Sequence, residues 1–300
     1  MVTSTRESDW SEHVPLTRRS AVSRASLLRR LARHRTAMAG LVILAVMLAG
    51  GLVGPHLIAR SPVEVDFNRV LQPPSRQHVF GTDNLGRDLF TRILYGTRVS
   101  FFIGVLAVVL SMALGVPVGL FSGYYGGRPD QFIQRMTDIL LAFPGILLAL
   151  TLISVLGIGI ENVIVSVGVG AVPVYVRLVR GTVLTIRELD YVEAARAIGM
   201  SDRRIILRHV LPNALPPIIV QSTLQVGTAI LLAAGLGFLG LGVQPPTPEW
   251  GTMIGEGQTY IFSSWYLEAF PGLATFLAVM AFNLLGDGLR DALDPRLTIL

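Results

Sequence analysis

Uncharged, mostly apolar runs alternate with short arginine-bearing segments along the chain. A helix needs about 20 apolar residues to cross about 30 Å of hydrocarbon, so each run is a candidate membrane span. We expect six spans, at residues 36–59, 99–127, 139–160, 162–176, 215–242 and 269–286. The pattern therefore predicts an all-α, polytopic membrane protein with six transmembrane helices.

Two of these spans need an argument beyond their length. The run at residues 209–248 has room for two helices, but proline clusters at residues 212–217 and 245–248 leave one helix between them. The run at residues 162–176 is short, and we expect Arg177 and Arg180 to extend it by reaching toward the lipid headgroups.

Composition supports a membrane protein and excludes several chemistries. Of the 300 residues, 51% are apolar and 15% are charged, against about 25% charged in soluble domains. The chain has no cysteine, which excludes thiolate catalysis, disulfides and cysteine-bound metals. All 25 basic residues are arginine, which excludes a P-loop, because that loop holds ATP phosphates through a lysine.

The arginines also set the expected topology. A sequence pI of about 10.1 would suit a nucleic-acid-binding protein, but the arginines lie between the spans and not on one folded face. With six spans, 19 of the 25 fall on the side of both termini and six on the other side. Because cytoplasmic loops carry the excess of arginine, we expect both termini in the cytoplasm and no nucleic-acid partner.

The spans divide the chain into segments. We expect a partly disordered cytoplasmic segment at residues 1–36, a first transmembrane helix at 37–59, an extracytoplasmic segment at 60–98, a core of five transmembrane helices at 99–292 with a cytoplasmic connection at 184–213, and a cytoplasmic tail at 293–300. The first helix is too long, and its basic leader too extended, for a cleaved signal peptide. Most of the chain is therefore expected to lie within the lipid bilayer.

The extracytoplasmic segment is expected to end in an interfacial helix. From residue 89 onward, apolar side chains recur at helical spacing opposite Arg92 and Arg98, a pattern typical of a helix lying on the membrane surface. Asp83 and Asp88 lie just before it. Their spacing does not match the calcium loop, so we favour a structural turn and a helix start over a ligand role.

The cytoplasmic connection predicts two short helices. Asp190 and Glu193 resemble a capping box that starts a helix over residues 191–198, and Gly199 suits the left-handed position that ends it. Ser201 is expected to cap a second helix over residues 202–211, which Pro212 would end. The alanine-rich first helix could be gripped by another protein or could be a plain connecting loop, and the residues alone do not decide between them.

Small and polar residues inside the spans carry further expectations. Gly115, Gly119 and Gly123 predict a close helix–helix approach, and the glycines of residues 235–242 predict tight packing at the end of the fifth span. Asp138 is expected to pair with Arg135 one turn earlier. Polar groups at membrane depth usually face a bundle interior or a wet pathway, so the candidates for lining a pathway, or for bonding between helices, are Gln221, Gln225 and Asn283.

Sequence patterns typical of catalytic sites are not evident. The five histidines show no metal-ligand spacing, and no nucleophile elbow occurs. We therefore expect no metal site, no catalytic residue and no cofactor bound by this chain. An intramembrane hydrolase would need a nucleophile–base pair, and a stand-alone secondary transporter would need an internal repeat and ionisable coupling groups.

Four blocks resemble a known family. Residues 193–199, followed by residues 209–213, are similar to the EAA motif of ABC importer permeases. Residues 80–88, residues 238–246 with Trp250, and residues 282–290 resemble the branch that imports peptides or nickel. The resemblance runs from about residue 78 to 296. Thr91 departs from it, because the family often has serine there. The short first external segment is similar to that of C-type subunits.

The resemblance implies a type I ABC importer permease fold in a bacterial cytoplasmic membrane. It implies a homologous B-type permease as partner, two ATPase subunits that carry ATP and Mg, and an extracytoplasmic solute-binding protein. Di- and oligopeptides are the first expected substrates, with nickel chelates or glutathione as alternatives.

The resemblance also assigns roles to residues. Those expected to couple to the ATPases are Glu193, Ala194, Ala195, Arg196, Ile198, Gly199 and Met200. Those expected to dock the solute-binding protein are Gln244, Glu249 and Trp250.

Overall fold

The chain folds into helices, and most connections between them are short except the long segment between Leu57 and Leu89. The computed structural model describes residue 32 and residues 34–58 and 60–293, and contains no strand within them. The helices are α2 (Arg35–Leu57), α3 (Leu89–Tyr125), α4 (Gly127–Ala142), α5 (Gly145–Leu156), α6 (Ile160–Ile186), α7 (Asp190–Ala197), α8 (Asp202–Ile205), α9 (Leu211–Phe238), α10 (Trp250–Gly257) and α11 (Tyr266–Leu293), with short turns η1 (Phe67–Arg69) and η3 (Gln258–Tyr260) and a π-helical segment η2 (Ile206–Val210). The segments expected at 1–36 and 293–300 lie almost entirely outside the described residues.

Five of these helices are long and apolar enough to span a membrane. They are α2, α3, α6, α11 and the continuous run of α8, η2 and α9. The expected third span is broken, since α4 and α5 meet at 94°. Phe143 and Pro144 separate them, and proline holds the residue before it in an extended conformation, which stops α4. Counted as one crossing, the bent pair gives the six spans expected.

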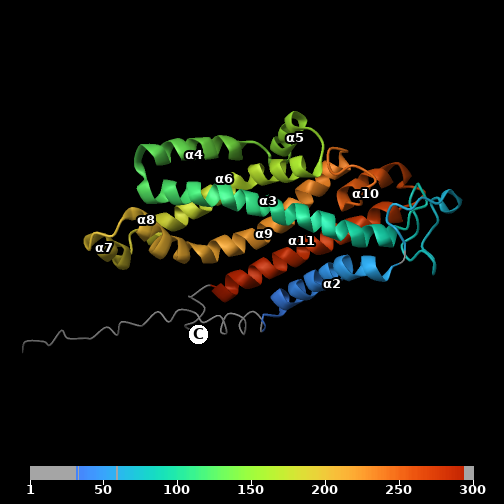
Figure 1. The fold of residues 1–300 in the computed structure, drawn as a ribbon, viewed down its shortest axis with the longest axis horizontal. Coiled ribbons are helices and arrows are strands. Elements are labelled where there is room, and N and C mark those ends of the chain that lie inside the picture. The colour runs from blue at the N-terminus through green and yellow to red at the C-terminus, as the bar shows by residue number, and fades with distance from the viewer. Residues whose placement is uncertain (1–31, 33, 59, 294–300) are drawn as a thin grey trace, which may run out of the picture.

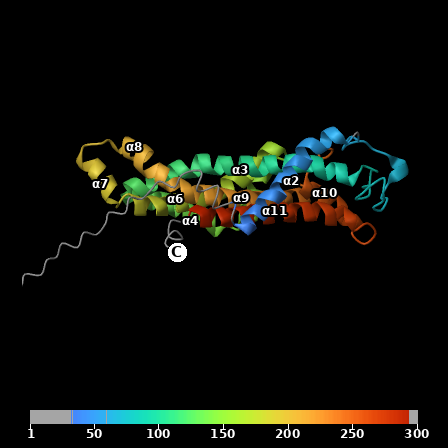
Figure 2. The same ribbon diagram turned by 90° about the horizontal axis from the view of Figure 1, so that it is seen from below.

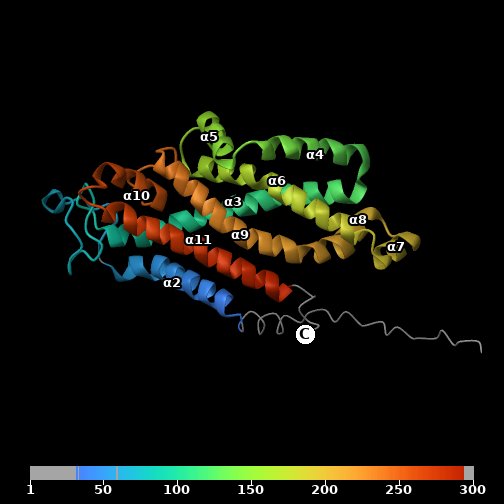
Figure 3. The same cartoon turned by 180° about the vertical axis from the view of Figure 1, so that it is seen from behind.

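The helices form an elongated bundle (Figures 1 and 2). α3, α6, α9 and α11 run along its length, and α2 lies against α11. α7 and α8 lie at one end of the bundle, and residues 60–88 with α10 lie at the other. Seen from behind, α4 and α5 cover the side of the bundle away from α2 (Figure 3). The segment with seven arginines and the segment with six are therefore at opposite ends, as the topology prediction requires.

The predicted glycines of α3 pack closely against α6. A Cβ atom added to Gly115 would lie 2.6 Å from the Tyr175 Cβ, and one added to Gly119 would lie 2.8 Å from the Val179 Cβ. Gly123 meets Val183 in the same way, at 2.8 Å. The expected small-residue packing is confirmed, because the two backbones approach too closely for any larger side chain.

The expected interfacial helix does not form as a separate element. Its residues are the first turns of α3, which continues without a break from Leu89 to Tyr125. Arg92 is 1% exposed and forms ion pairs with Asp83 and Glu256. Arg98 donates to the Gly51 and Leu52 carbonyls of α2. Both arginines of the expected polar face therefore bind groups of this chain, a carboxylate cluster for Arg92 and backbone carbonyls for Arg98.

Pro212 does not end a helix either. It lies in the first turn of α9, directly after the π-helical segment η2, and α8, η2 and α9 run on as one rod. The Leu211 N–H donates to the Ile206 carbonyl, five residues back. This wider turn precedes a helix with prolines at 212, 216 and 217, and π-bulges are the places where a helix adjusts its bonding without stopping.

The arginines of α6 bind carboxylates of α4. Arg180 holds Asp130 through two hydrogen bonds, Nε to Oδ1 at 2.6 Å and Nη2 to Oδ2 at 2.7 Å. Arg177 pairs with Asp138. The expected reach of these arginines toward headgroups is wrong, as is the expected pair of Asp138 with Arg135. The Arg180–Asp130 pair is bidentate and charge-assisted, which is the strong form of this interaction.

Candidate functional site

The two-turn helix at the arginine-rich end is α7, as predicted, but its start differs. Leu189 is the N-cap, and no side chain caps the first turn by a hydrogen bond. Asp190 and Glu193 lie inside the first turn. The expected capping box is therefore wrong. The two carboxylates stabilise the helix through its dipole, which places partial positive charge at the N-terminus.

The end of α7 is the predicted left-handed stop. Gly199 has φ of +78°, a conformation that L side chains adopt at a cost. Its N–H donates to the Arg196 carbonyl at 3.0 Å, and the Met200 N–H donates to the Ala195 carbonyl at 3.1 Å. These two bonds form a Schellman motif. The turn fixes the direction in which the chain leaves α7.

α7 is held by one face and leaves the other free. Val192 is fully buried and Ala195 is 5% exposed, so Ala195, expected in the contact surface, belongs instead to the anchoring face. Glu193, Ala194, Arg196 and Gly199 are exposed, and Met200 is half-buried. Ile198 is 79% exposed. Most of the residues expected to couple are thus brought together on one convex surface.

The polar residues of α9 divide into two groups. Gln221 donates to Gln225 within the same helix at 3.4 Å, so this pair does not join helices. Ser222 does bond across helices, because the Tyr175 hydroxyl of α6 donates to it at 3.1 Å. Asn283 lies on α11 with an exposed side chain. Lining of a pathway stays a prediction for Gln221, Gln225 and Asn283.

At the opposite end, two of the three expected docking residues are buried. Glu249 is 1% exposed and Trp250 is fully buried. Only Gln244 is exposed. The expectation that Glu249 and Trp250 contact another protein is wrong, because both side chains are used to fix α10 inside this chain.

Glu249 fastens α10 to α3. Its carboxylate caps α10 by accepting from the Thr252 N–H at 2.9 Å, and it accepts from the Ser100 hydroxyl of α3 at 3.0 Å. A Cβ on Gly237 would lie 2.6 Å from this carboxylate, so the predicted tight glycine packing at the end of α9 is confirmed. Burial raises the pKa of Glu249 above its usual value, against the hydrogen bonds that lower it.

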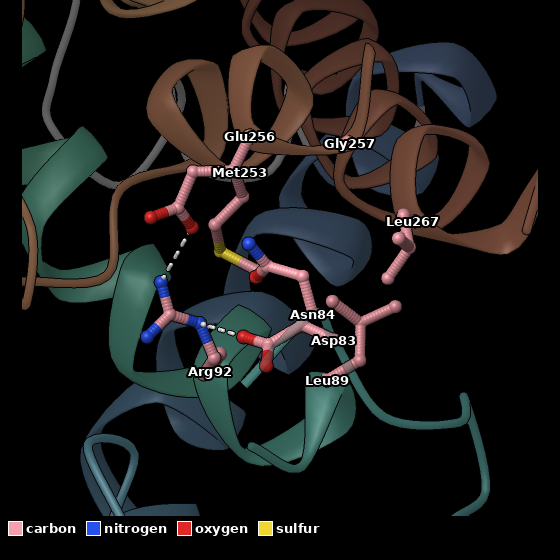
Figure 4. A pocket seen from close by; sticks show the side chains of 8 residues that line it. All are labelled: Asp83, Asn84, Leu89, Arg92, Met253, Glu256, Gly257 and Leu267. Carbon is pink, nitrogen blue, oxygen red and sulfur yellow. Dashed lines mark hydrogen bonds and ion pairs between the residues drawn. The ribbon is translucent and has the colours of Figure 1, made fainter. Parts of the chain in front are cut away.

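A buried ionic cluster lies beside α10. Arg87 donates to Asp83 at 2.6 Å and to Glu256 at 3.1 Å. Arg92 donates to the same Glu256 oxygen at 3.1 Å and also pairs with Asp83 (Figure 4). The arginines are 2% and 1% exposed. Two cations face two anions, so the cluster is neutral and each buried charge has a partner. It ties the start of α3 to the loop that contains α10.

Asp88 has the structural role predicted for it. It is the N-cap of α3 and accepts from the Thr91 N–H at 2.9 Å. Burial acts to raise the pKa of Asp88, but hydrogen bonds from Thr91 and His78 and the charge of Arg60 hold it below its usual value. Asp83 accepts from the N–H groups of Leu85 and Arg87. The predicted turn at Asp83 and helix start at Asp88 are confirmed.

The sequence does not predict the pairing that holds the start of α3, between Arg92 and Glu256. Glu256 is 164 positions from Arg92, and nothing in one sequence pairs them. The one available signal was charge. The loop at residues 243–267 has two glutamates and no arginine, and the segment expected on the same side of the membrane, residues 60–98, has six arginines.

Comparison with known proteins gives consistent matches. Residues 115–299 match the family described as binding-protein-dependent transport system inner membrane component. Residues 25–74 match the N-terminal TM domain of oligopeptide transport permease C.

Curated relatives match over most of their length. The dipeptide transport system permease protein DppC of Alkalihalophilus pseudofirmus is 46% identical over 269 residues, 90% of this chain and 88% of the relative. The glutathione transport system permease protein GsiD of Pectobacterium atrosepticum is 44% identical over 270 residues, 90% of each chain. GsiD of Escherichia coli is 47% identical over 273 residues, 90% of this chain and 89% of the relative.

Solved structures share the fold. A structure of the MetNI methionine ABC transporter in inward-facing conformations aligns with a TM-score of 0.55 at 21% identity, covering 68% of this chain and 97% of the other. An amino acid ABC transporter aligns with a TM-score of 0.52 at 13% identity, covering 67% of this chain and 94% of the other.

Proposed function

The chain belongs to the family of binding-protein-dependent transport system inner membrane components, and we propose that it works as the C-type half of a heterodimeric importer. It is an ABC importer permease with the type I fold in the cytoplasmic membrane. In our proposal a homologous B-type permease supplies the other half of the pathway. Two ATPase subunits bind the cytoplasmic face with ATP and Mg, and an extracytoplasmic solute-binding protein delivers the substrate.

Charge supports the proposed orientation. The end of the bundle that holds α7 carries seven arginines between residues 177 and 208, and arginine-rich loops face the cytoplasm. The first residue of α2 and the last residue of α11 lie at the ends of these helices that are nearer to α7 (Figure 1). Both termini are then cytoplasmic, and α10 is extracytoplasmic.

The exposed surface of α7 is the observation that carries the coupling proposal. A chain without lysine has no P-loop, so energy from ATP must arrive through contact with another subunit. α7 presents Ile198 and Ala194 to solvent on a helix that Val192 anchors and Gly199 ends. An ATPase groove that receives this surface would move α7 as a body. The contact must differ in free energy between the two states of the ATPase dimer, since an equal contact would not shift the equilibrium between the two conformations of the permease.

Of the two roles expected for Glu193, capping α7 and pairing with an ATPase residue, only the second is retained. It makes no cap hydrogen bond and is exposed on the contact surface. Its carboxylate is therefore free to pair with a basic residue of the ATPase subunit, as the resemblance to the EAA motif implies.

The substrate is proposed to be a dipeptide or an oligopeptide, because DppC is named for dipeptide transport. Glutathione is the second candidate, because several relatives at 44% to 47% identity are named as glutathione transport permeases. Uptake of labelled dipeptide and labelled glutathione in a deletion strain separates the two. Loss of dipeptide uptake alone supports the first proposal, and loss of glutathione uptake alone supports the second.

The coupling role is tested by Gly199→Val. Valine is poorly tolerated at a positive φ, so the variant should lose transport and release or uncouple the ATPases while the spans still insert. Co-purification in mild detergent measures the first effect and ATP hydrolysis the second. Unchanged uptake by this variant would refute the coupling role of α7, and transport by the lone chain would refute the importer-subunit proposal.

A further inference from the structure

Contacts from three places around α7 converge on one tyrosine at the end of α3. Tyr124 is 7% exposed. Its hydroxyl donates to the Asp202 carboxylate at 2.8 Å, and Asp202 is the first residue of α8. The Arg196 guanidinium, on α7 itself, lies 5.9 Å from the centre of the tyrosine ring. Arg187, three residues before α7, donates to the Tyr124 carbonyl at 3.4 Å.

These contacts bracket α7 along the chain. Arg187 precedes it, Arg196 is within it and Asp202 follows it, while Tyr124 is 78 positions before Asp202. Arg187 also donates to the Gly123 carbonyl at 3.0 Å, which satisfies a carbonyl of the last turn of α3. A displacement of α7 must therefore either carry the end of α3 with it or break contacts that include a hydrogen bond to a charged group.

The far end of α3 is fastened to α10. Its 37 residues form one helix, about 55 Å long at 1.5 Å per residue. At that end the Trp250 indole donates to the Ile93 carbonyl at 3.1 Å, and Ser100 donates to Glu249 at 3.0 Å. One continuous helix thus joins the segment around α7 to the loop at the opposite end of the bundle (Figure 1).

We propose that Tyr124 is the positioning residue through which a displacement of α7 reaches α3 and, along α3, the loop that contains α10. The proposal rests on the proposed function, because it takes α7 as the contact with the ATPase subunits. Tyr124 touches neither substrate nor nucleotide. It acts by holding Asp202 and Arg196 in a fixed relation to the last turn of α3.

The first test compares two adjacent tyrosines. Tyr124→Phe removes the hydroxyl that binds Asp202 and keeps the ring that faces Arg196. Tyr125→Phe is the matched control, because Tyr125 is 49% exposed and makes no side-chain hydrogen bond in the described part of the chain. Both variants are studied as the full complex in proteoliposomes. The readout is the amount of labelled dipeptide, or of glutathione if the wild type takes that up, transported per ATP hydrolysed.

Tyr124→Phe should lower this ratio at least about fivefold, the lower end of typical coupling effects, with the ATPases still co-purifying and still hydrolysing ATP. Tyr125→Phe should leave the ratio unchanged. A Tyr124→Phe complex that transports as much substrate per ATP as the wild type overturns the proposal, as does an equal loss in both variants.

A second test uses the partner residue. Asp202→Ala should lower the ratio as Tyr124→Phe does. The double variant should have the same ratio as either single variant, because the two substitutions remove the same hydrogen bond. Additive losses overturn the proposal. If no ATPase subunit co-purifies with the wild-type chain, the proposed function fails. If the wild type transports and only the variants behave otherwise than stated, the role of Tyr124 fails alone.

Discussion

A substitution at Gly199 changes the backbone at the end of α7 without creating a steric clash. No atom lies within 4 Å of a Cβ added there, so a substitution creates no collision, and only the backbone at φ of +78° resists it. For an ordinary L residue this conformation costs about 1–2 kcal/mol. Asparagine tolerates it better, and β-branched residues tolerate it worst. We therefore expect destabilisation of the turn to increase from Gly199→Asn to Gly199→Ala to Gly199→Val.

Hydrogen exchange at the end of α7 measures this cost. Strain at Gly199 weakens the bonds of its own N–H and of the Met200 N–H, which close the Schellman motif. A cost of about 1–2 kcal/mol should speed exchange of the Met200 amide in Gly199→Ala by about 5- to 30-fold, and transport should fall in the same order as the series. Gly181→Ala on α6 is the control, since Gly181 also has open space but no positive φ. Unchanged exchange in Gly199→Ala, or equal exchange in all three variants, would refute the reasoning.

Three further predictions concern stability in detergent, measured as the midpoint of thermal unfolding. Gly119→Ala should destabilise the protein by about 1–3 kcal/mol, because its Cβ would lie 2.8 Å from that of Val179. Gly181→Ala, in open space within α6, should instead stabilise the helix by up to about 1 kcal/mol; equal effects would contradict the packing argument. Glu249→Ala should cost about 1–3 kcal/mol by leaving buried donors unsatisfied, and Glu249→Gln should cost less. Because burial raises the pKa of Glu249 above its usual 4.5, the wild type should lose stability as pH rises through that raised pKa, and a Gln variant with the same pH slope would contradict this. Arg180→Met should cost about 1–3 kcal/mol by leaving the Asp130 carboxylate without its bidentate partner, and adding Asp130→Asn should restore part of the loss; no recovery would contradict the pairing.

Local features of the fold were predictable where the physics is local. The apolar runs predicted α2, α6 and α11, because the length and hydrophobicity of a segment are enough to identify a membrane span. Gly115, Gly119 and Gly123 revealed the close approach of α3, and Gly199 revealed the end of α7, since only glycine satisfies those backbones without cost.

Three of the wrong predictions involve pairs of residues that are far apart in the chain. The sequence predicts Arg92 on the polar face of a helix at the membrane surface, whereas in the structure it pairs with Glu256. Arg180 looked like an extension of a short span until Asp130 was placed opposite it. The sequence predicts that Trp250 docks a solute-binding protein, whereas its buried indole N–H donates to the Ile93 carbonyl. In each case the partner lies far away in the chain, so only the tertiary fold shows whether a polar side chain meets water, lipid or another residue.

The central claim is that α7 is the point where ATPase subunits grip this chain. The chain has no cysteine, so Ile198→Cys supplies a single thiol at a side chain that is 79% exposed. A bifunctional cross-linker applied to the assembled complex should join this thiol to an ATPase subunit, and ATP should change the yield. A control thiol from Gln244→Cys, at the opposite end, should not join to it. No link from residue 198 to an ATPase, or labelling of residue 198 in intact cells by a membrane-impermeant maleimide, would contradict the account.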